Sequence, residues 1–426
     1  MESSAPSEEK PAVPAPKPKG RLQTFRALRY RDFRLLWIGL VVSSVGTWMQ
    51  IIAQSLLVLH ITHGSALALG IVSLAQALSF FLFALLGGSM ADRIDKRRLL
   101  LFTQSMSMLL AFLFALLTYI GVIQVWMIVL LAFCSGTVLS FDQPSRSALI
   151  PILVPRENLM NAISLQSIVF NGAAVFGPAL AGVTIGIIGY AGNFFLNGVS
   201  YLGVLLALYV MRVPKEAAEA STERRGPLLD SIRAALGAVR RDAALPWILS
   251  GYGALLFFGP SSSLILPIFA TQVLHISAFQ LGLLFAASGI GTVIGALTIA
   301  SLGDFQYKGL LLLVSFLLWA GALFLFAFSR LFWLSVFALF LFGVAQNGVG
   351  ATTITLMQTR VPPQMRGRVM SLNTLLIMGV RPLGDFPAGG LITLISAPPT
   401  VIISASIVAL YTLYLLLARP AVRQLT

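Results

Sequence analysis

The stretch Gly88-Ser89-Met90-Ala91-Asp92-Arg93-Ile94-Asp95-Lys96-Arg97-Arg98 places six charged residues where two long apolar runs meet, at about 66–90 and 99–121. Each run is long enough to cross the roughly 30 Å hydrocarbon core of a bilayer as a helix. The whole chain is similar: of 426 residues, 57% are hydrophobic and 10% are charged, whereas a soluble domain carries about 25% charged residues. Because the apolar runs are continuous rather than alternating, they predict membrane helices and exclude a β-barrel.

Charges and turn residues divide the rest of the chain in the same way. The longest hydrophilic stretch, 212–242, falls in the middle and predicts one amphipathic helix around 228–239. We therefore predict an all-α integral membrane fold with twelve transmembrane helices in two pseudo-symmetric six-helix bundles. The expected spans are 34–60, 66–90, 99–121, 125–148, 159–188, 192–212, 244–271, 278–302, 309–328, 331–357, 368–395 and 398–418. The expected parts are a disordered cytoplasmic tail (1–20), an N-terminal bundle (21–212), a cytoplasmic linker (213–242), a C-terminal bundle (243–420) and a short cytoplasmic tail (421–426).

The basic residues predict the orientation. With twelve spans, every Lys and Arg except Arg330 and Arg381 falls on the side of the two termini. Basic loops face the cytoplasm, so both termini are predicted to be cytoplasmic. The net charge of +14 then reflects topology and contact with anionic membrane lipids, and it does not indicate a nucleic-acid partner.

The two halves also repeat each other at an offset of 207 residues. The pairs are Gly136 with Gly343, Gly177 with Gly384 and Gly182 with Gly389, together with Val154-Pro155 and Val361-Pro362 and with Ser164-Leu165 and Ser371-Leu372. A parallel repeat of six spans is typical of a two-bundle transporter whose substrate site lies between the bundles near the middle of the membrane.

The charged stretch at 88–98 resembles the signature loop of the major facilitator superfamily, G-x-x-x-D-R-x-G-x-R-R, with Asp95 in place of the second glycine. The resemblance implies a latch that closes the cytoplasmic mouth when the transporter faces outward. The alternative is that the cations only fix topology. For Asp142 and Arg146, the alternative is a local salt bridge between these two residues at the end of a helix. The residues assigned to the latch by the resemblance are Gly88, Asp92, Arg93, Lys96, Arg97, Asp142 and Arg146.

Other motifs resemble one particular branch of this superfamily. The stretches 30–37, 46–50 and 141–155 resemble the branch that contains the bacterial enterobactin exporter and related multidrug permeases, over nearly the whole chain after residue 20. Gly177, Pro178 and Gly182 look like part of the G-P-x-x-G-G element of drug–proton antiporters, although tight helix packing explains them equally well. The resemblance implies a bacterial inner-membrane exporter that acts as a monomer.

Arg381 and Asp385 lie in the middle of the predicted eleventh span, beside Pro382 and Pro387. Charges at that depth are costly and tend to find partners or mark pathways. They predict either a substrate or proton site or a buried structural pair in a kinked helix. Arg381 suits an anionic or catecholate-like ligand, and Asp385 suits a proton or a cationic ligand.

The pore lining is predicted by the resemblance, which assigns it to spans one, four, seven and ten. We expect proton-coupled efflux of a small amphiphilic molecule, a siderophore or a drug-like compound, with no enzyme activity, no cofactor and no metal site. An importer or facilitator of the same fold, or a non-transporting sensor or scaffold, remains an alternative. The main lining candidates are Trp48, Gln50, Gln54, Tyr252, Gln346 and Asn347.

Overall fold

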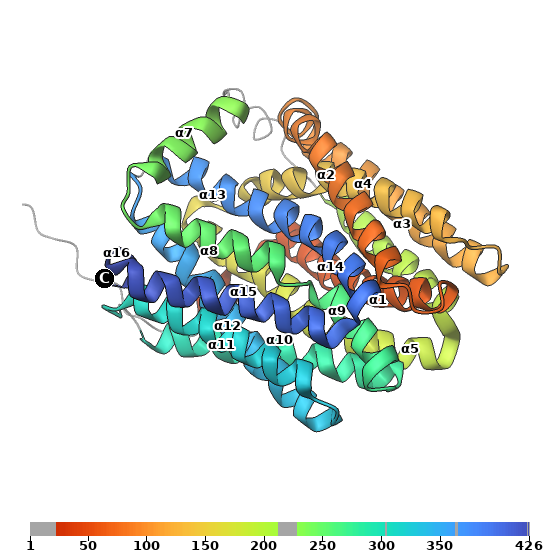
Figure 1. The fold of residues 1–426 in the computed structure, drawn as a ribbon. Helices are drawn as coiled ribbons and strands as arrows, with labels where there is room; N and C mark the ends of the chain where they lie inside the picture. Colours follow the sequence, from red (N-terminus) through yellow and green to blue (C-terminus); the bar gives the residue numbers. More distant parts are fainter. Residues whose placement is uncertain (1–22, 212–227, 303–304, 363–364, 424, 426) are drawn as a thin grey trace, which may run out of the picture.

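The computed structural model describes residues 23–211, 228–302, 305–362, 365–423 and 425. Within this part, all regular elements are helices, and most of the long ones run lengthwise through the molecule (Figure 1). The predicted all-α fold is thus confirmed. The predicted tail at 1–20 and residues 213–227 of the predicted linker lie outside the described part of the chain.

The N-terminal half begins with a 3-10 turn, Gln23–Arg29, and continues with five α-helices. These are α1 (Arg31–Ile61), α2 (Ala66–Arg93), α3 (Lys96–Tyr119), α4 (Val125–Leu153) and α5 (Leu159–Val210).

The predicted linker helix is present as α7 (Leu228–Arg240), set apart from the long helices in Figure 1. The C-terminal half follows it, and two of its spans are assembled from several pieces. Its elements are α8 (Leu245–Phe258), α9 (Ser262–Ile268), η3 (Phe269–Val273), α10 (Ala278–Leu302), α11 (Lys308–Phe328), α12 (Phe332–Thr359), α13 (Arg366–Leu375), η5 (Leu376–Val380), α14 (Arg381–Ile395), α15 (Ala397–Ala418) and α16 (Pro420–Arg423).

Eleven helical segments of the described residues are long and apolar enough to cross a membrane. One of them contains α5, whose 52 residues are interrupted at Gly189 by a left-handed backbone conformation (φ 69°). Leu165 accepts a hydrogen bond from Trp37 near the start of α1, and Gly203 packs against Gly39 nearby. Residues on either side of Gly189 therefore return to the same end of α1. The α5 element is a helical hairpin that contains both the fifth and the sixth predicted span.

The seventh predicted span is not the continuous helix that the sequence predicts. It breaks between α8 and α9 at Gly259, Pro260 and Ser261. Pro260 has no backbone N–H to continue the helix, and Ser261 starts α9 as its N-cap by accepting a hydrogen bond from the Leu264 N–H. The break leaves a new helix N-terminus inside the protein.

The internal repeat is confirmed in three dimensions. Each repeated glycine allows a close approach to a helix, and the two members of a pair approach equivalent helices of the two halves. Gly136 lies against α2 and Gly343 against α10; Gly177 lies against α1 and Gly384 against α8; Gly182 lies against α10 and Gly389 against α2. An added Cβ would meet backbone or side-chain atoms at each position, so these glycines set how closely the helices pack.

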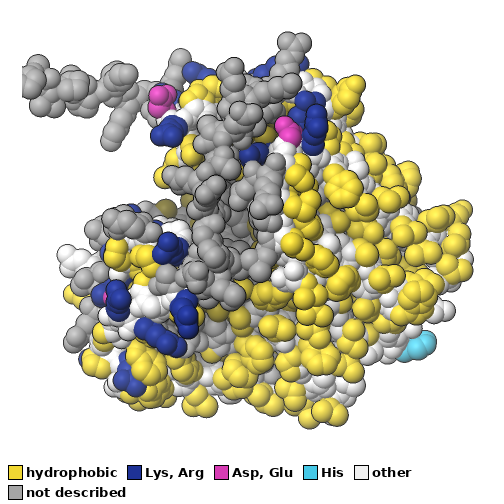
Figure 2. Space-filling model, turned by 90° about the horizontal axis from the view of Figure 1, so that it is seen from above, with side chains coloured by type: hydrophobic (Ala, Val, Ile, Leu, Met, Phe, Trp, Pro, Cys, Tyr) yellow, Lys and Arg dark blue, Asp and Glu magenta, His cyan; other side chains and the backbone are white. Residues whose placement is uncertain are grey.

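Contacts between the bundles begin at one end of the molecule and continue along α2, α14 and η5 as far as Phe81 and Gly379. A Cβ at Gly389 of α14 would lie 2.6 Å from the Ala66 carbonyl oxygen, and one at Gly282 of α10 would lie 2.7 Å from the Pro178 carbonyl oxygen. Gln272 of η3 also donates to the Gly64 carbonyl (2.6 Å). The contacts at Ala66, Gly282 and Gln272 lie at the opposite end of the helices from the end that we call the basic end, which is marked by Arg97, Arg156, Arg241, Arg360 and Arg368. Figure 2 shows Lys and Arg gathered towards one side of the face seen there, with apolar side chains over the remainder.

Candidate functional site

Asp385 of α14 is buried at the break in the seventh span. Its side chain belongs to a residue that is only 3% exposed. One carboxylate oxygen accepts a hydrogen bond from the Ser261 N–H (2.9 Å), and the other accepts one from the Ser261 hydroxyl (2.8 Å). A carboxylate at a helix N-terminus also interacts favourably with the helix dipole. The start of α9 therefore stabilises a negative charge at a depth where an isolated charge would be costly.

A helix from the other bundle reaches the same carboxylate. A Cβ at Gly70 of α2 would lie 3.0 Å from the Asp385 carbonyl oxygen, so the backbones of α2 and α14 are in close contact here. The Ser73 side chain, one turn further along α2, lies near the Asp385 carboxylate. Asp385 thus lies where α2, α9 and α14 meet, on the contact between the two bundles.

Arg381 lies one turn before Asp385, but in the described part of the chain these two side chains form no ion pair. The Arg381 Nε atom is buried and has no hydrogen-bond partner, while its charge acts both on Asp385 and on Tyr252 of α8. The residue follows the π-helical turn η5 and precedes Pro382. A wide turn before a proline accommodates the missing N–H and the ring. The Arg381 guanidinium therefore has an unused hydrogen-bond donor at Nε and lies within electrostatic range of the Tyr252 phenol.

Asp142 of α4 is the second buried carboxylate, and its partners all belong to the N-terminal half. It forms an ion pair with Arg146 one turn away. It also accepts hydrogen bonds from Thr103 (3.0 Å) and Gln104 (2.6 Å) of α3. The structure therefore contains the local Asp142–Arg146 pair and ties it to α3.

The loop at 88–98 is described only in part. The backbone of α2 runs through Gly88, Asp92 and Arg93, but their side chains lie outside the described residues. Asp95, which replaces the family's second glycine, is the N-cap of α3 and accepts a hydrogen bond from the Arg98 N–H (2.8 Å).

The two remaining cations of the loop that were assigned to the latch lie in the N-terminal half. Arg97 donates to the carbonyl oxygens of Leu208 (2.6 Å) and Tyr209 (2.8 Å) at the end of α5, and Lys96 is buried. In this conformation Arg97 is thus a C-terminal cap of α5, where cations are favourable, and it is not a partner of Asp142.

Two of the predicted lining residues pack between helices of one bundle, and the other four are buried or half-buried. Gln50 accepts a hydrogen bond from Asn197 of α5 (2.6 Å), and Trp48 packs edge-on against Phe170 with ring centroids 6.1 Å apart. These two side chains therefore hold α1 and α5 together. Asn347 has a buried Oδ1 atom with no hydrogen-bond partner. The half-buried residues are Gln54, Gln346 and Asn347, and Tyr252 is buried.

Gly177, Pro178 and Gly182 all lie on packing faces of α5. Gly177 lies against Trp48 and Val45 of α1, and Gly182 lies against the start of α10. The Pro178 carbonyl, in turn, faces Gly282 of α10. The motif therefore joins α5 both to its own bundle and to the other one.

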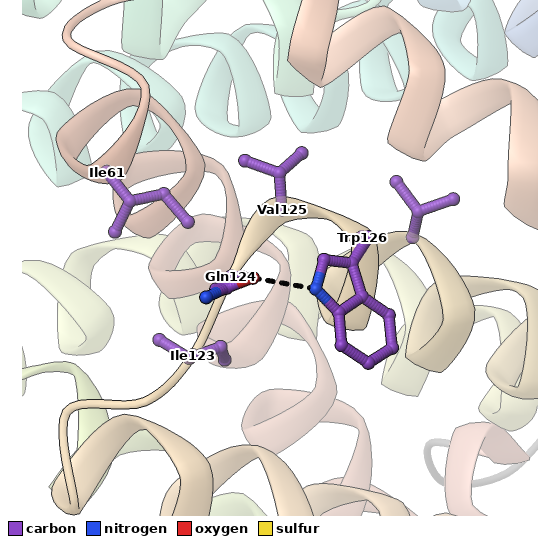
Figure 3. A pocket seen from close by; sticks show the side chains of 6 residues that line it. Ile61, Ile123, Gln124, Val125 and Trp126 are labelled. Carbon is purple, nitrogen blue, oxygen red and sulfur yellow. Dashed lines mark hydrogen bonds between the residues drawn. The ribbon is translucent and has the colours of Figure 1, made fainter.

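A groove of about 680 Å³ at the end of α1 and the start of α4 is separate from these charged residues (Figure 3). It is lined by Ile61, Ile123, Gln124, Val125, Trp126 and Val129, and the Trp126 indole N–H donates to the Gln124 side-chain oxygen (2.7 Å). Its lining is uncharged, so it has no group suited to a proton or to an ionic substrate.

Sequence reasoning named Arg146 as a partner of Asp142, but it did not identify the other residues that surround the two buried carboxylates. Ser73, Thr103 and Gln104 are single polar residues on long apolar helices, and nothing in their spacing points to a distant partner. Ser261 offered a signal, because a serine directly after Gly259-Pro260 is a helix-start pattern. The described residues contain no cluster of three or more His, Cys, Asp or Glu suited to a metal ion.

Comparisons with known proteins agree with this architecture. The family model described as "Transmembrane secretion effector" matches residues 22–425, so the chain belongs to this family of major facilitator transporters. It is 28% identical over 380 residues to the enterobactin exporter EntS of Citrobacter koseri, and the aligned region covers 88% of each chain. To EntS of Salmonella paratyphi A it is 29% identical over 381 residues, again 88% of each.

Solved structures share the fold at low sequence identity. A POT family transporter in complex with a peptide conjugate matches with a TM-score of 0.72 and 12% identity, covering 94% of this chain and all of that one. A bacterial homologue of the lysosomal transporter Spinster, inward-facing and unoccupied, matches with a TM-score of 0.69 and 13% identity, covering 92% and 96%. The chain is therefore a multi-pass membrane transporter with the major facilitator fold.

Proposed function

We propose that this transporter exports a small amphiphilic molecule, driven by the proton gradient through alternating access of its two bundles. The observation that carries the proposal is the buried Asp385 carboxylate on the contact between the bundles. The bundles would be residues 21–212 and 243–420, joined by the linker at 213–242. Both termini and the basic end would face the cytoplasm, as the distribution of Lys and Arg indicates.

With this orientation, the conformation described here faces inward. The close approaches at Gly282 and Gly389 lie in the half away from the basic end, so that half is the closed one. The latch proposed for Asp92, Arg93 and Lys96 would act in the opposite state, when the basic ends of the bundles meet. Arg97 would then either leave the end of α5 or remain there as its cap.

Asp385 would be the proton carrier. Protonation removes its negative charge, and with it the charge-assisted part of the two hydrogen bonds from Ser261. Since α2 contacts α14 at this residue, the protonation state acts directly on the contact between the bundles. Protons can be coupled to a conformational change when a titratable group lies on a contact that exists in one conformation and not in the other.

Arg381 would bind the substrate. A guanidinium with a free donor suits a carboxylate or a catecholate, and the Tyr252 ring beside it adds an amphipathic surface. The relatives are named for the export of enterobactin, which makes enterobactin the first probe. A non-siderophore amphiphile is the alternative substrate class.

The experiment is uptake of enterobactin into everted membrane vesicles that contain this protein and have an acidic interior. The proposal predicts accumulation above the external concentration, and its loss when a protonophore collapses the gradient. Equilibration without accumulation would instead indicate a facilitator. Absence of any uptake, both of enterobactin and of a cationic and an anionic dye, would refute the transport of amphiphiles.

A further inference from the structure

A groove of about 680 Å³ lies at the basic end, between the linker helix α7 and the ends of α12 and α13. Four arginines and one carboxylate provide its charged lining, so the groove has a net charge of about +3 at neutral pH. The remaining lining side chains are small or apolar. The groove is lined by Arg233, Gly237, Ala238, Arg241, Asp242, Arg360, Pro362, Met365 and Arg368.

The Asp242 carboxylate in the groove already has partners within the protein. One Asp242 oxygen accepts hydrogen bonds from the N–H groups of Ala244 (2.8 Å) and Leu245 (2.9 Å), which caps the start of α8. The other oxygen pairs with Arg360 (3.3 Å). Asp242 therefore neutralises about one of the four cations, and the groove keeps an excess of positive charge that favours an anion.

The helix that forms one wall of the groove is amphipathic. Ala235 and Val239 of α7 are buried against the bundle, whereas Arg233 and Arg240 are exposed. Leu236 also remains 42% exposed on this short helix. A basic amphipathic helix with an exposed apolar residue beside membrane helices is typical of an element that lies at the bilayer surface.

We propose that this groove binds the phosphate headgroup of an anionic phospholipid and thereby anchors the linker to the C-terminal bundle. Arginine forks match phosphate oxygens, and basic pockets at the cytoplasmic ends of membrane helices suit such headgroups. The apolar wall from Ala238, Pro362 and Met365 favours a lipid over free phosphate, because an acyl glycerol can cover apolar surface that inorganic phosphate cannot. This site is independent of the transport function proposed above.

The test compares two double variants of the full-length protein with the same charge change. Arg233→Gln with Arg241→Gln removes two cations of the groove, and Arg240→Gln with Arg366→Gln removes two exposed cations outside it. Binding of phosphatidylglycerol to the purified protein in detergent is measured by native mass spectrometry, with phosphatidylcholine as the zwitterionic comparison. Thermal unfolding of both variants, without lipid, checks that they fold.

The expected result is about 30-fold weaker binding of phosphatidylglycerol in the groove variant, a factor of about five for each arginine near the surface. The control variant should lose less than about threefold, and phosphatidylcholine binding should not change. Equal losses in the two variants would overturn the site, since binding would then depend on overall charge alone. Inorganic phosphate that displaces phosphatidylglycerol at millimolar concentration would overturn the assignment to a lipid.

Discussion

Replacing Asp385 with asparagine tests the coupling role most directly. The substitution keeps the size of the side chain and leaves one oxygen to accept the Ser261 N–H, but it removes the charge. A hydrogen bond to a charged group contributes about 1.5–3 kcal/mol and a neutral one about 0.5–1.5 kcal/mol. With two such bonds from Ser261, Asp385→Asn should destabilise this conformation by about 2 kcal/mol. That corresponds to a roughly 30-fold shift in a two-state equilibrium.

The assay separates that destabilisation from coupling. Enterobactin accumulation in everted vesicles with an acidic interior should be lost in Asp385→Asn, while exchange of enterobactin without a gradient should continue. Ser261→Ala is the matched control, because it keeps the carboxylate and its bond from the Ser261 N–H while it removes the hydroxyl bond to Asp385 and the N-cap bond from Leu264. It should lose about 2–4 kcal/mol of stability and still accumulate enterobactin. Gradient-driven accumulation at the wild-type level in Asp385→Asn would refute the proton-carrier role.

A double-mutant cycle examines what stabilises Asp385. Because the Arg381 charge acts on Asp385 without forming an ion pair with it, Arg381→Gln and Asp385→Asn should show a coupling in thermal stability of about 1 kcal/mol, at the lower end of what neighbouring residues show. A coupling of several kcal/mol, of the kind that buried ion pairs show, would mean that Arg381 rather than Ser261 compensates the charge.

Three further outcomes are expected. In a cysteine-free background, a cysteine at Arg240 should be labelled only from the cytoplasm and one at Arg330 only from outside; the reverse at either site would contradict the orientation. Asp92→Asn should abolish most transport at near-normal protein levels, and full activity would leave the loop as a topology signal. Gly282→Val should reduce transport and cost about 1–3 kcal/mol, because its Cβ meets the α5 backbone. Gly321→Val, which has open space, should be neutral for both.

The sequence by itself determined the class of fold. The lengths of the apolar runs are set by the thickness of the bilayer, so the positions of the spans and the linker helix could be predicted within a few residues. The repeat at an offset of 207 residues also predicted the pseudo-symmetry, because a glycine that allows two helices to pack closely is needed at the same place in each half. These features depend on local composition and spacing, which a sequence contains in full.

The tertiary structure alone decided which groups neutralise the buried charges. Spacing along a helix favoured Arg381 as the partner of Asp385, four residues away, but the carboxylate is held by Ser261, 124 residues earlier in the chain. Likewise, Arg97 binds carbonyl groups at the end of α5. In a membrane interior an unpartnered charge is costly, and its partner is set by which helix ends and kinks the packing brings near it. The breaks at Gly259–Ser261 and at Gly189 create such ends, and their positions relative to other helices are not encoded in any local pattern.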